Sequence, residues 1–182
     1  AESSRPVTCA KGLIVHPHLA FADCPPLDYL LVPGGQGTRR EVGNQALLDF
    51  VSLQARSCKA VLSVCTGAFV LHAAGLLSGK RATTHWASLE RLRALGDVDV
   101  VEERYVKDGK VWSSAGVSAG MDLMLAFIAS VAGEDAAGHA ATRARRESDQ
   151  NLPLLLPNQP SERDSTGTPP NSLETPAWHR SA

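Results

Sequence analysis

A cysteine between small residues is the feature of this sequence best suited to chemistry. Residues 63–67 read SVCTG, so a small side chain stands two positions before and two positions after Cys65. The apolar run AVLSV leads into the cysteine and the helix-like AFVLHAAGLL follows shortly after it. A sharp turn between a strand and a helix crowds the backbone, requires small neighbours and pushes the central side chain outward. The pattern therefore predicts that Cys65 is a catalytic nucleophile on an elbow.

The predicted helix after Cys65 adds an electrostatic effect. The first N–H groups of a helix have no partner within it, and the helix dipole places a partial positive charge there. Both effects favour the thiolate, which is the nucleophilic form of cysteine. The alternative is a buried structural cysteine, a common environment for this residue type, and the spacing alone does not separate the two.

A glycine-rich loop follows the neighbouring apolar run. Residues 33–37 read PGGQG, and loops at the carboxyl ends of adjacent parallel strands meet over one crevice. We expect the backbone N–H groups of Gly35 and Thr66 to form an oxyanion hole, with Gly34 allowing the substrate to approach the backbone. The alternative is an ordinary glycine turn. Phosphate binding is disfavoured because the loop lacks the Walker spacing.

His85 is the remaining candidate for the site. It stands 20 residues after Cys65 within the segment TTHW, and a histidine near the cysteine could act as a base or as a hydrogen-bond partner that binds substrate. The alternative is a histidine that packs beside Trp86.

The composition limits the classes of function. Lys and Arg number 18 against 19 Asp and Glu, for a net charge of -1, so no global field attracts nucleic acid. The chain has no CxxC pair and is too poor in cysteine for a disulfide scaffold, so we expect no metal, no cofactor and free thiols in the cytoplasm. The four thiols belong to Cys9, Cys24, Cys58 and Cys65.

Short apolar runs alternate with helical patterns in the first half of the chain, which predicts an α/β fold with a mostly parallel sheet. Strands are expected at 12–15, 29–32 and 60–64. A helix over 66–77 is expected to end at Gly79. Another helix is predicted between the last two strands by apolar residues at helical spacing, namely Leu47, Leu48, Val51 and Ala55.

The second half continues the alternation. A short amphipathic helix at 89–95 should end at Gly96, and β-rich runs at 98–106 and 110–113 flank a Lys-Asp-Gly turn typical of a hairpin. The helix expected over 116–133 is apolar almost all round, which favours burial against a second subunit in a homodimer.

Three further segments bear on the organisation. Residues 60–77 carry no formal charge, but their polar interruptions favour a buried strand and helix over a membrane span. The basic run 142–146 is interpreted as cations at a helix C-terminus. From residue 151 the chain is rich in Pro, Ser and Thr, so we expect one domain over 1–150 and a disordered tail over 151–182.

Over about positions 10 to 140 the sequence resembles the ThiJ/PfpI superfamily of class I glutamine amidotransferase-like proteins. The segments FADCPPLDYLLVPGGQG, SVCTGAFVLHAAGLLSGKRATTHW and SSAGVSAGMDL are similar to the isocyanide (isonitrile) hydratase branch and to the amidotransferase-like domain of AraC-type regulators. The resemblance implies a flavodoxin-like three-layer sandwich, a homodimer, a nucleophile at Cys65 and oxyanion donors at Gly35 and Thr66.

The sequence departs from that superfamily in two respects. The superfamily places another strand and helix before the region of residues 12–15, with an acid at the end of the strand, and residues 1–5 supply no equivalent. We therefore expect an N-terminally incomplete fold with impaired catalysis. Thr66 also stands where PfpI-type peptidases carry a histidine, so a peptidase is disfavoured.

The leading hypothesis is an isocyanide hydratase-like lyase that converts a small-molecule isocyanide to an N-substituted formamide. One alternative is the ligand-sensing domain of a transcriptional regulator, in which this chain alone would not bind nucleic acid because residues 151–182 are too short for a helix-turn-helix. Another is a redox-responsive relative without turnover, since an exposed reactive thiol is readily oxidised.

Overall fold

The computed structural model describes residues 1–9 and 11–151. The chain divides into two compact units after Ala141, and residues 142–151 of the second unit complete the last helix. The strands are β1 (Val7–Thr8), β2 (Ile14–Val15), β3 (Tyr29–Val32), β4 (Ala60–Val64), β5 (Arg81–Ala82), β6 (Asp99–Val100), β7 (Tyr105–Asp108) and β8 (Val111–Ser114). The α-helices are α1 (Thr38–Glu41), α2 (Gln45–Ser57), α3 (Gly67–Ala73), α4 (Leu89–Arg93), α5 (Ser118–Ala132) and α6 (Glu134–Asn151), and the 3-10 turns are η1 (Phe21–Asp23) and η2 (Trp86–Ser88).

The central sheet of the first unit has four strands in the order β3-β4-β8-β7. Strands β3 and β4 run parallel with Val32 opposite Ser63, and β4 and β8 run parallel with Val64 opposite Ser114. Only β7 is antiparallel, because a tight turn at Gly109 returns the chain directly into β8. The mostly parallel sheet and the hairpin are both confirmed.

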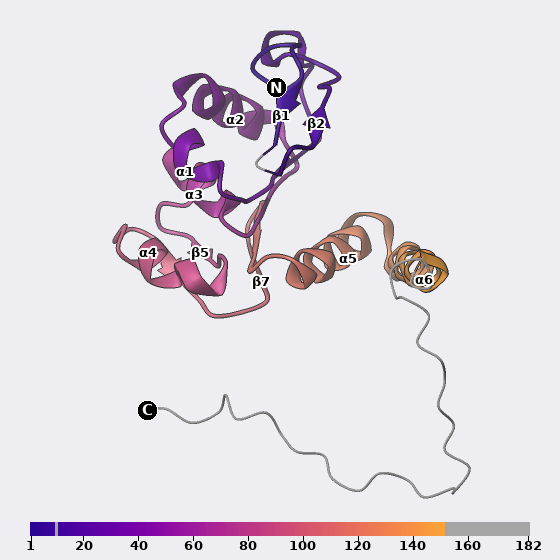
Figure 1. The fold of residues 1–182 in the computed structure, drawn as a ribbon. Coiled ribbons are helices and arrows are strands. Elements are labelled where there is room, and N and C mark those ends of the chain that lie inside the picture. The colour runs from indigo at the N-terminus through magenta and orange to yellow at the C-terminus, as the bar shows by residue number, and fades with distance from the viewer. Residues whose placement is uncertain (10, 152–182) are drawn as a thin grey trace, which may run out of the picture. The chain divides into compact units, whose positions relative to one another are not determined.

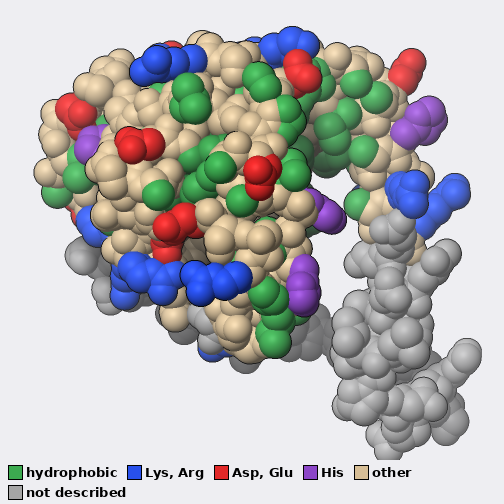
Figure 2. All heavy atoms as spheres, turned by 90° about the horizontal axis from the view of Figure 1, so that it is seen from above, with side chains coloured by type: hydrophobic (Ala, Val, Ile, Leu, Met, Phe, Trp, Pro, Cys, Tyr) green, Lys and Arg blue, Asp and Glu red, His purple; other side chains and the backbone are tan. Residues whose placement is uncertain are grey.

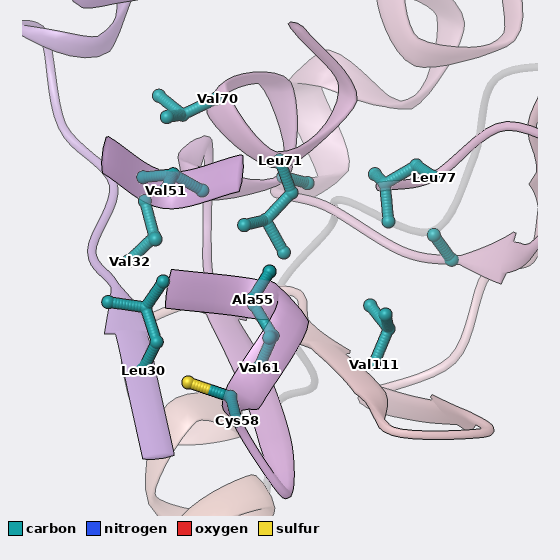
Figure 3. Packing of buried hydrophobic residues seen from close by; sticks show 12 residues of the cluster. Leu30, Val32, Val51, Ala55, Cys58, Val61, Val70, Leu71, Leu77 and Val111 are labelled. Carbon is teal, nitrogen blue, oxygen red and sulfur yellow. The ribbon is translucent and has the colours of Figure 1, made fainter. Parts of the chain in front are cut away.

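Alternation along the strands directs side chains to two opposite faces of the sheet. Val61 and Val111 pack with residues of α2 and α3, as Figure 3 shows. Their neighbours Leu62 and Trp112 pack on the other face against Leu123 and Phe127 of α5. The helices α2 and α3 therefore cover one face and α5 the other (Figure 1), which confirms the three-layer α/β sandwich.

The strand predicted at 12–15 is reduced to β2, which pairs antiparallel with β1 and lies outside the central sheet. A tight turn explains the difference. The Gly12 N–H donates to the Cys9 carbonyl, and Gly12 has a φ of 83°, a conformation that glycine adopts without strain. The turn folds the strand back onto the residues just before it.

The helix predicted over 66–77 ends at Ala73, because Gly75 rather than Gly79 stops it. Gly75 has a φ of 75° and donates its N–H to the His72 carbonyl, while the Leu76 N–H donates to the Leu71 carbonyl. These two hydrogen bonds form a Schellman motif, which satisfies the last carbonyls of the helix.

Other segments also differ from the predictions. The run 98–106 is divided between β6, which pairs with β5, and β7. The basic run 142–146 lies inside α6 rather than at its C-terminus, because that helix continues to Asn151. Elsewhere, the Nε2 of the half-buried His72 lies 2.7 Å from the Asp97 Oδ1, and this hydrogen bond holds the pKa of the Asp97 carboxyl below its usual value.

Two predictions on organisation bear on the ends of the chain and on membranes. Among the residues described, none belongs to a helix that is both long and apolar enough to cross a membrane. The tail predicted from residue 151 lies outside the described residues, apart from Asn151 at the end of α6.

Candidate functional site

Cys65 lies on a strained turn between β4 and α3. Its φ is 58°, in the left-handed region that side chains other than glycine rarely adopt. Two hydrogen bonds fix this conformation: the Cys65 N–H donates to the Ser114 carbonyl at 2.9 Å, and the buried Thr84 hydroxyl donates to the Cys65 carbonyl at 2.9 Å. Backbone strain held by surrounding bonds is typical of functional positions.

Glycines surround this turn because the backbone segments approach too closely for any side chain. A Cβ built at Gly67 would lie 2.2 Å from the Val32 carbonyl oxygen, and one at Gly34 would lie 2.6 Å from the Thr66 nitrogen. A Cβ at Gly116 would lie 2.8 Å from the Cys65 Cβ and 3.2 Å from its Sγ. The elbow around Cys65 thus also packs against a third segment, the loop after β8. The sequence did not lead us to expect this contact at Gly116.

The glycine loop and the elbow are joined by two threonines. The Gly35 N–H donates to the Thr66 Oγ1 at 2.9 Å. The Thr38 hydroxyl is 2.7 Å from the Gly35 carbonyl oxygen and 3.0 Å from the Thr66 Oγ1. The two predicted loops do face each other, although the Gly35 amide already has a partner. The Thr66 N–H, at the N-cap of α3, has no acceptor within the helix.

Valine at position 66 should loosen this junction. Thr66→Val keeps the shape of the side chain but removes the acceptor of the Gly35 N–H, so we expect a loss of about 1 kcal/mol in the free energy of unfolding. The Thr66 hydroxyl does not cap α3, so the substitution leaves the helix N-terminus unchanged and removes only the contact with the Gly35 loop. Thr66→Ser should recover most of the loss in urea unfolding. Equal destabilisation by valine and serine would contradict this account.

His85 precedes the 3-10 turn η2 and caps it. Its Nδ1 accepts the Ala87 N–H at 3.3 Å, so the neutral ring carries its proton on Nε2. The ring lies 5.4 Å from that of Trp86, which is itself exposed. His85 thus packs beside Trp86, and its role in binding substrate stays a prediction.

A pocket of about 300 Å³ brings these groups together. Cys65, Thr66, Gly35 and His85 all line it, whereas Gly34 lies behind the pocket, against the backbone of the elbow. Its other lining residues are Gln36, Thr38, Arg39, Ala87, Ser88 and Arg91. Within residues 1–9 and 11–151, no three His, Cys, Asp or Glu side chains are placed to hold a metal ion.

The four cysteines are free thiols in different environments. Cys9 is exposed, while Cys24 and Cys65 are half-buried. Cys58 is 3% exposed, and burial raises the pKa of its thiol above the usual value. Cys65 is therefore the cysteine that combines a strained turn with an opening into the pocket.

The fold and the site define a class of protein: a flavodoxin-like α/β sandwich that carries a cysteine on a strand-to-helix elbow. Comparison with known families is consistent with this class. The chain belongs to the DJ-1/PfpI family, whose family model matches residues 1–130.

Two of the similar proteins differ in function. The chain is 46% identical to an isonitrile hydratase of Pseudomonas putida over 132 residues, which cover 72% of this chain and 58% of that protein. It is 31% identical to the HTH-type transcriptional regulator GbdR of Pseudomonas aeruginosa, over 94% of this chain and 49% of that protein.

A solved structure shows the same fold. The crystal structure of a ThiJ/PfpI family protein from Pseudomonas syringae matches with a TM-score of 0.70 and 33% identity, over 92% of this chain and 65% of that one. The chain thus spans between about half and two thirds of the length of these relatives.

Proposed function

We propose that this protein hydrates an isocyanide to an N-substituted formamide, with Cys65 as the nucleophile. The observation that carries the proposal is the strained elbow, which places Cys65 in a pocket with Gly35, Thr66 and His85. Similarity to an isonitrile hydratase supports the choice of reaction. The absence of a histidine after the cysteine disfavours a peptidase, as the sequence indicated.

The proposed chemistry proceeds in two stages. The Cys65 thiolate attacks the terminal isocyanide carbon, a C–S bond forms, and the carbon takes up a proton to give a thioimidate. Water then adds to that carbon, the C–S bond breaks, and the products are the formamide and the regenerated thiol. The Thr66 N–H would stabilise developing negative charge, and the Gly35 N–H would join it when released from the Thr66 hydroxyl.

His85 has a supporting role in this proposal. Its Nδ1 already accepts the Ala87 N–H, so Nε2–H is the atom that would donate a hydrogen bond or a proton to the bound substrate. Among the residues that line the pocket, it is the one imidazole.

Product formation tests the proposed reaction. The purified protein is incubated with a simple alkyl isocyanide, and the formyl proton of the product is followed by NMR. We expect formamide to accumulate faster than in buffer alone. A folded protein that forms no formamide above the buffer rate would refute the proposal.

The relationship to GbdR supports a second candidate, a ligand-sensing domain that binds a small molecule without turnover. In that case calorimetry should detect ligand binding while no formamide forms. Binding to DNA upstream of its own gene at physiological salt would further support a regulator. Because this chain alone is not expected to bind nucleic acid, the result that would count against a sensor is the absence of calorimetric binding of a small molecule by the folded protein.

We also propose that the protein forms a homodimer through the outer face of α5. Val117, just before this helix, is 85% exposed, and Met121 is 61% exposed one turn later. Large exposed apolar side chains grouped on one helix are typical of a protein interface. Sedimentation equilibrium should give twice the mass of the chain, and Met121→Lys should shift that mass toward the monomer. A monomeric mass at micromolar concentration would contradict the dimer.

A further inference from the structure

Two arginines from separate elements line the pocket that holds Cys65. Arg39 belongs to α1 and Arg91 to α4. None of the residues that line this pocket is an aspartate or a glutamate. By contrast, acidic and basic side chains are interspersed on the molecular face shown in Figure 2. The pocket lining therefore carries positive charge, without the mixture of signs seen on that face.

Neither arginine is neutralised within the part of the chain that the structure describes. Other arginines of the chain have a carboxylate partner, namely Arg40, Arg81, Arg93 and Arg104. Arg39 and Arg91 form no ion pair among the described residues. The guanidinium carbon of Arg91 lies 3.8 Å from the centre of the Phe69 ring, which supports the group from one side. Among the described residues its N–H groups have no acceptor, so they can bind a ligand.

The surroundings of the two arginines indicate what else a ligand would carry. Both also line an adjoining hollow of about 390 Å³, whose other walls are largely apolar. These walls are formed by Val42, Phe69, His72, Ala73 and Leu95. A guanidinium pairs most strongly with a carboxylate or phosphate, because its planar fork matches two oxygens at once. The two hollows therefore suit a ligand with three parts: a group that reaches Cys65, a carboxylate beside the arginines, and an apolar group in the second hollow.

We propose that the pocket selects an anionic substrate, and specifically an isocyanide that carries a carboxylate bound by Arg39 and Arg91. This inference rests on the proposed function for the identity of the reacting group. Hydration adds one water across the isocyanide carbon and leaves the carboxylate unchanged, so the product is an N-formyl amino acid. The apolar hollow would take the side chain of that amino acid.

The first test compares two substrates that differ in charge, isocyanoacetate and its methyl ester. We expect the ratio of kcat/KM for the anion over the ester to fall roughly tenfold in Arg39→Gln and in Arg91→Gln, since each loses a charged hydrogen bond to the carboxylate. Arg56→Gln is the matched control, because Arg56 is an exposed arginine on α2 that does not line the pocket. A ratio that is the same in all four proteins would overturn the inference while leaving the hydration reaction in place.

The second test does not depend on turnover. Iodoacetate and iodoacetamide alkylate a thiolate by the same displacement of iodide, and they differ mainly in charge. Peptide mass spectrometry gives the ratio of the two rates at Cys65, with the exposed Cys9 of the same chain as the reference. We expect the ratio to favour iodoacetate at Cys65 and to fall severalfold in both pocket variants.

The two tests separate the two proposals. If neither isocyanide is hydrated but Cys65 prefers iodoacetate in an Arg39- and Arg91-dependent way, the anion site stands and the isocyanide reaction fails. If Cys65 and Cys9 show equal ratios that the substitutions do not change, the anion site is refuted whatever the outcome for hydration.

Discussion

Replacing Cys65 with alanine should abolish formamide formation. The substitution removes the atom that forms the C–S bond, and loss of a catalytic nucleophile commonly lowers kcat by three orders of magnitude or more, so we expect a decrease of at least about 10³-fold. The remaining pocket groups cannot form the thioimidate. The measurement is the rate of appearance of the formyl proton, with circular dichroism to show that the variant is folded.

Cys58→Ala is the matched control. Cys58 is buried at the end of α2, packs in the apolar cluster between the sheet and α2, and has a raised pKa, so its thiol is not expected to react. This variant should keep nearly wild-type kcat at a temperature where it remains folded. With a slowly hydrolysed isocyanide, intact mass should reveal an adduct on the wild type and on Cys58→Ala but not on Cys65→Ala. Equal activity in the two alanine variants would refute the role of Cys65.

Alanine at Gly67 should cause the largest loss of stability among single methyl additions at the elbow. The new Cβ would lie 2.2 Å from the Val32 carbonyl oxygen and 3.1 Å from the Pro33 backbone. These atoms belong to β3 and the start of the glycine loop, so no side chain can rotate away and the backbone itself must move. Overpacking of this kind costs about 3 kcal/mol or more. We expect a large drop in the urea midpoint, or failure to fold.

Gly37→Ala tests whether the effect comes from the close approach rather than from glycine replacement in general. Gly37 has a φ of -60° and nothing within 4 Å of a built Cβ. Alanine there should leave stability unchanged or raise it by about 0.4–1 kcal/mol, because it restricts the unfolded chain. Similar midpoints for the Gly67 and Gly37 variants would contradict the close approach of Gly67 to the Val32 carbonyl.

Local signals in the sequence were sufficient to predict the part of the site built from consecutive residues. Short apolar runs identified β3 and β4. The run of β4 is buried on both faces, as expected of a central parallel strand, whereas Tyr29 and Leu31 of β3 are exposed. Small residues around Cys65 indicated the sharp turn, which Cys65 adopts with its positive φ. The meeting of the elbow with the Gly35 loop followed from one topological rule, that adjacent parallel strands end at the same edge. The catalytic roles of these residues stay predictions.

Local signals failed where a helix end or a strand pairing depended on competing partners. Gly75 and Gly79 are equally suitable as helix ends by residue type, and the hydrogen bonds from Gly75 and Leu76 decided between them. The residues around Ile14 carry an adequate strand pattern, but the turn at Gly12 determined which segment they pair with.

By itself, the sequence determined the fold class, the elbow at Cys65 and the glycine loop that faces it, because strand periodicity and turn chemistry are properties of neighbouring residues. Only the tertiary structure decided what encloses the thiol: Gly116 from the loop after β8, Thr38 from α1, and the two arginines Arg39 and Arg91. These residues are separated from Cys65 by 26 to 51 positions along the chain. They come together because the ends of their strands and helices lie at one edge of the sheet. Spacing along the chain does not predict which ends share that edge.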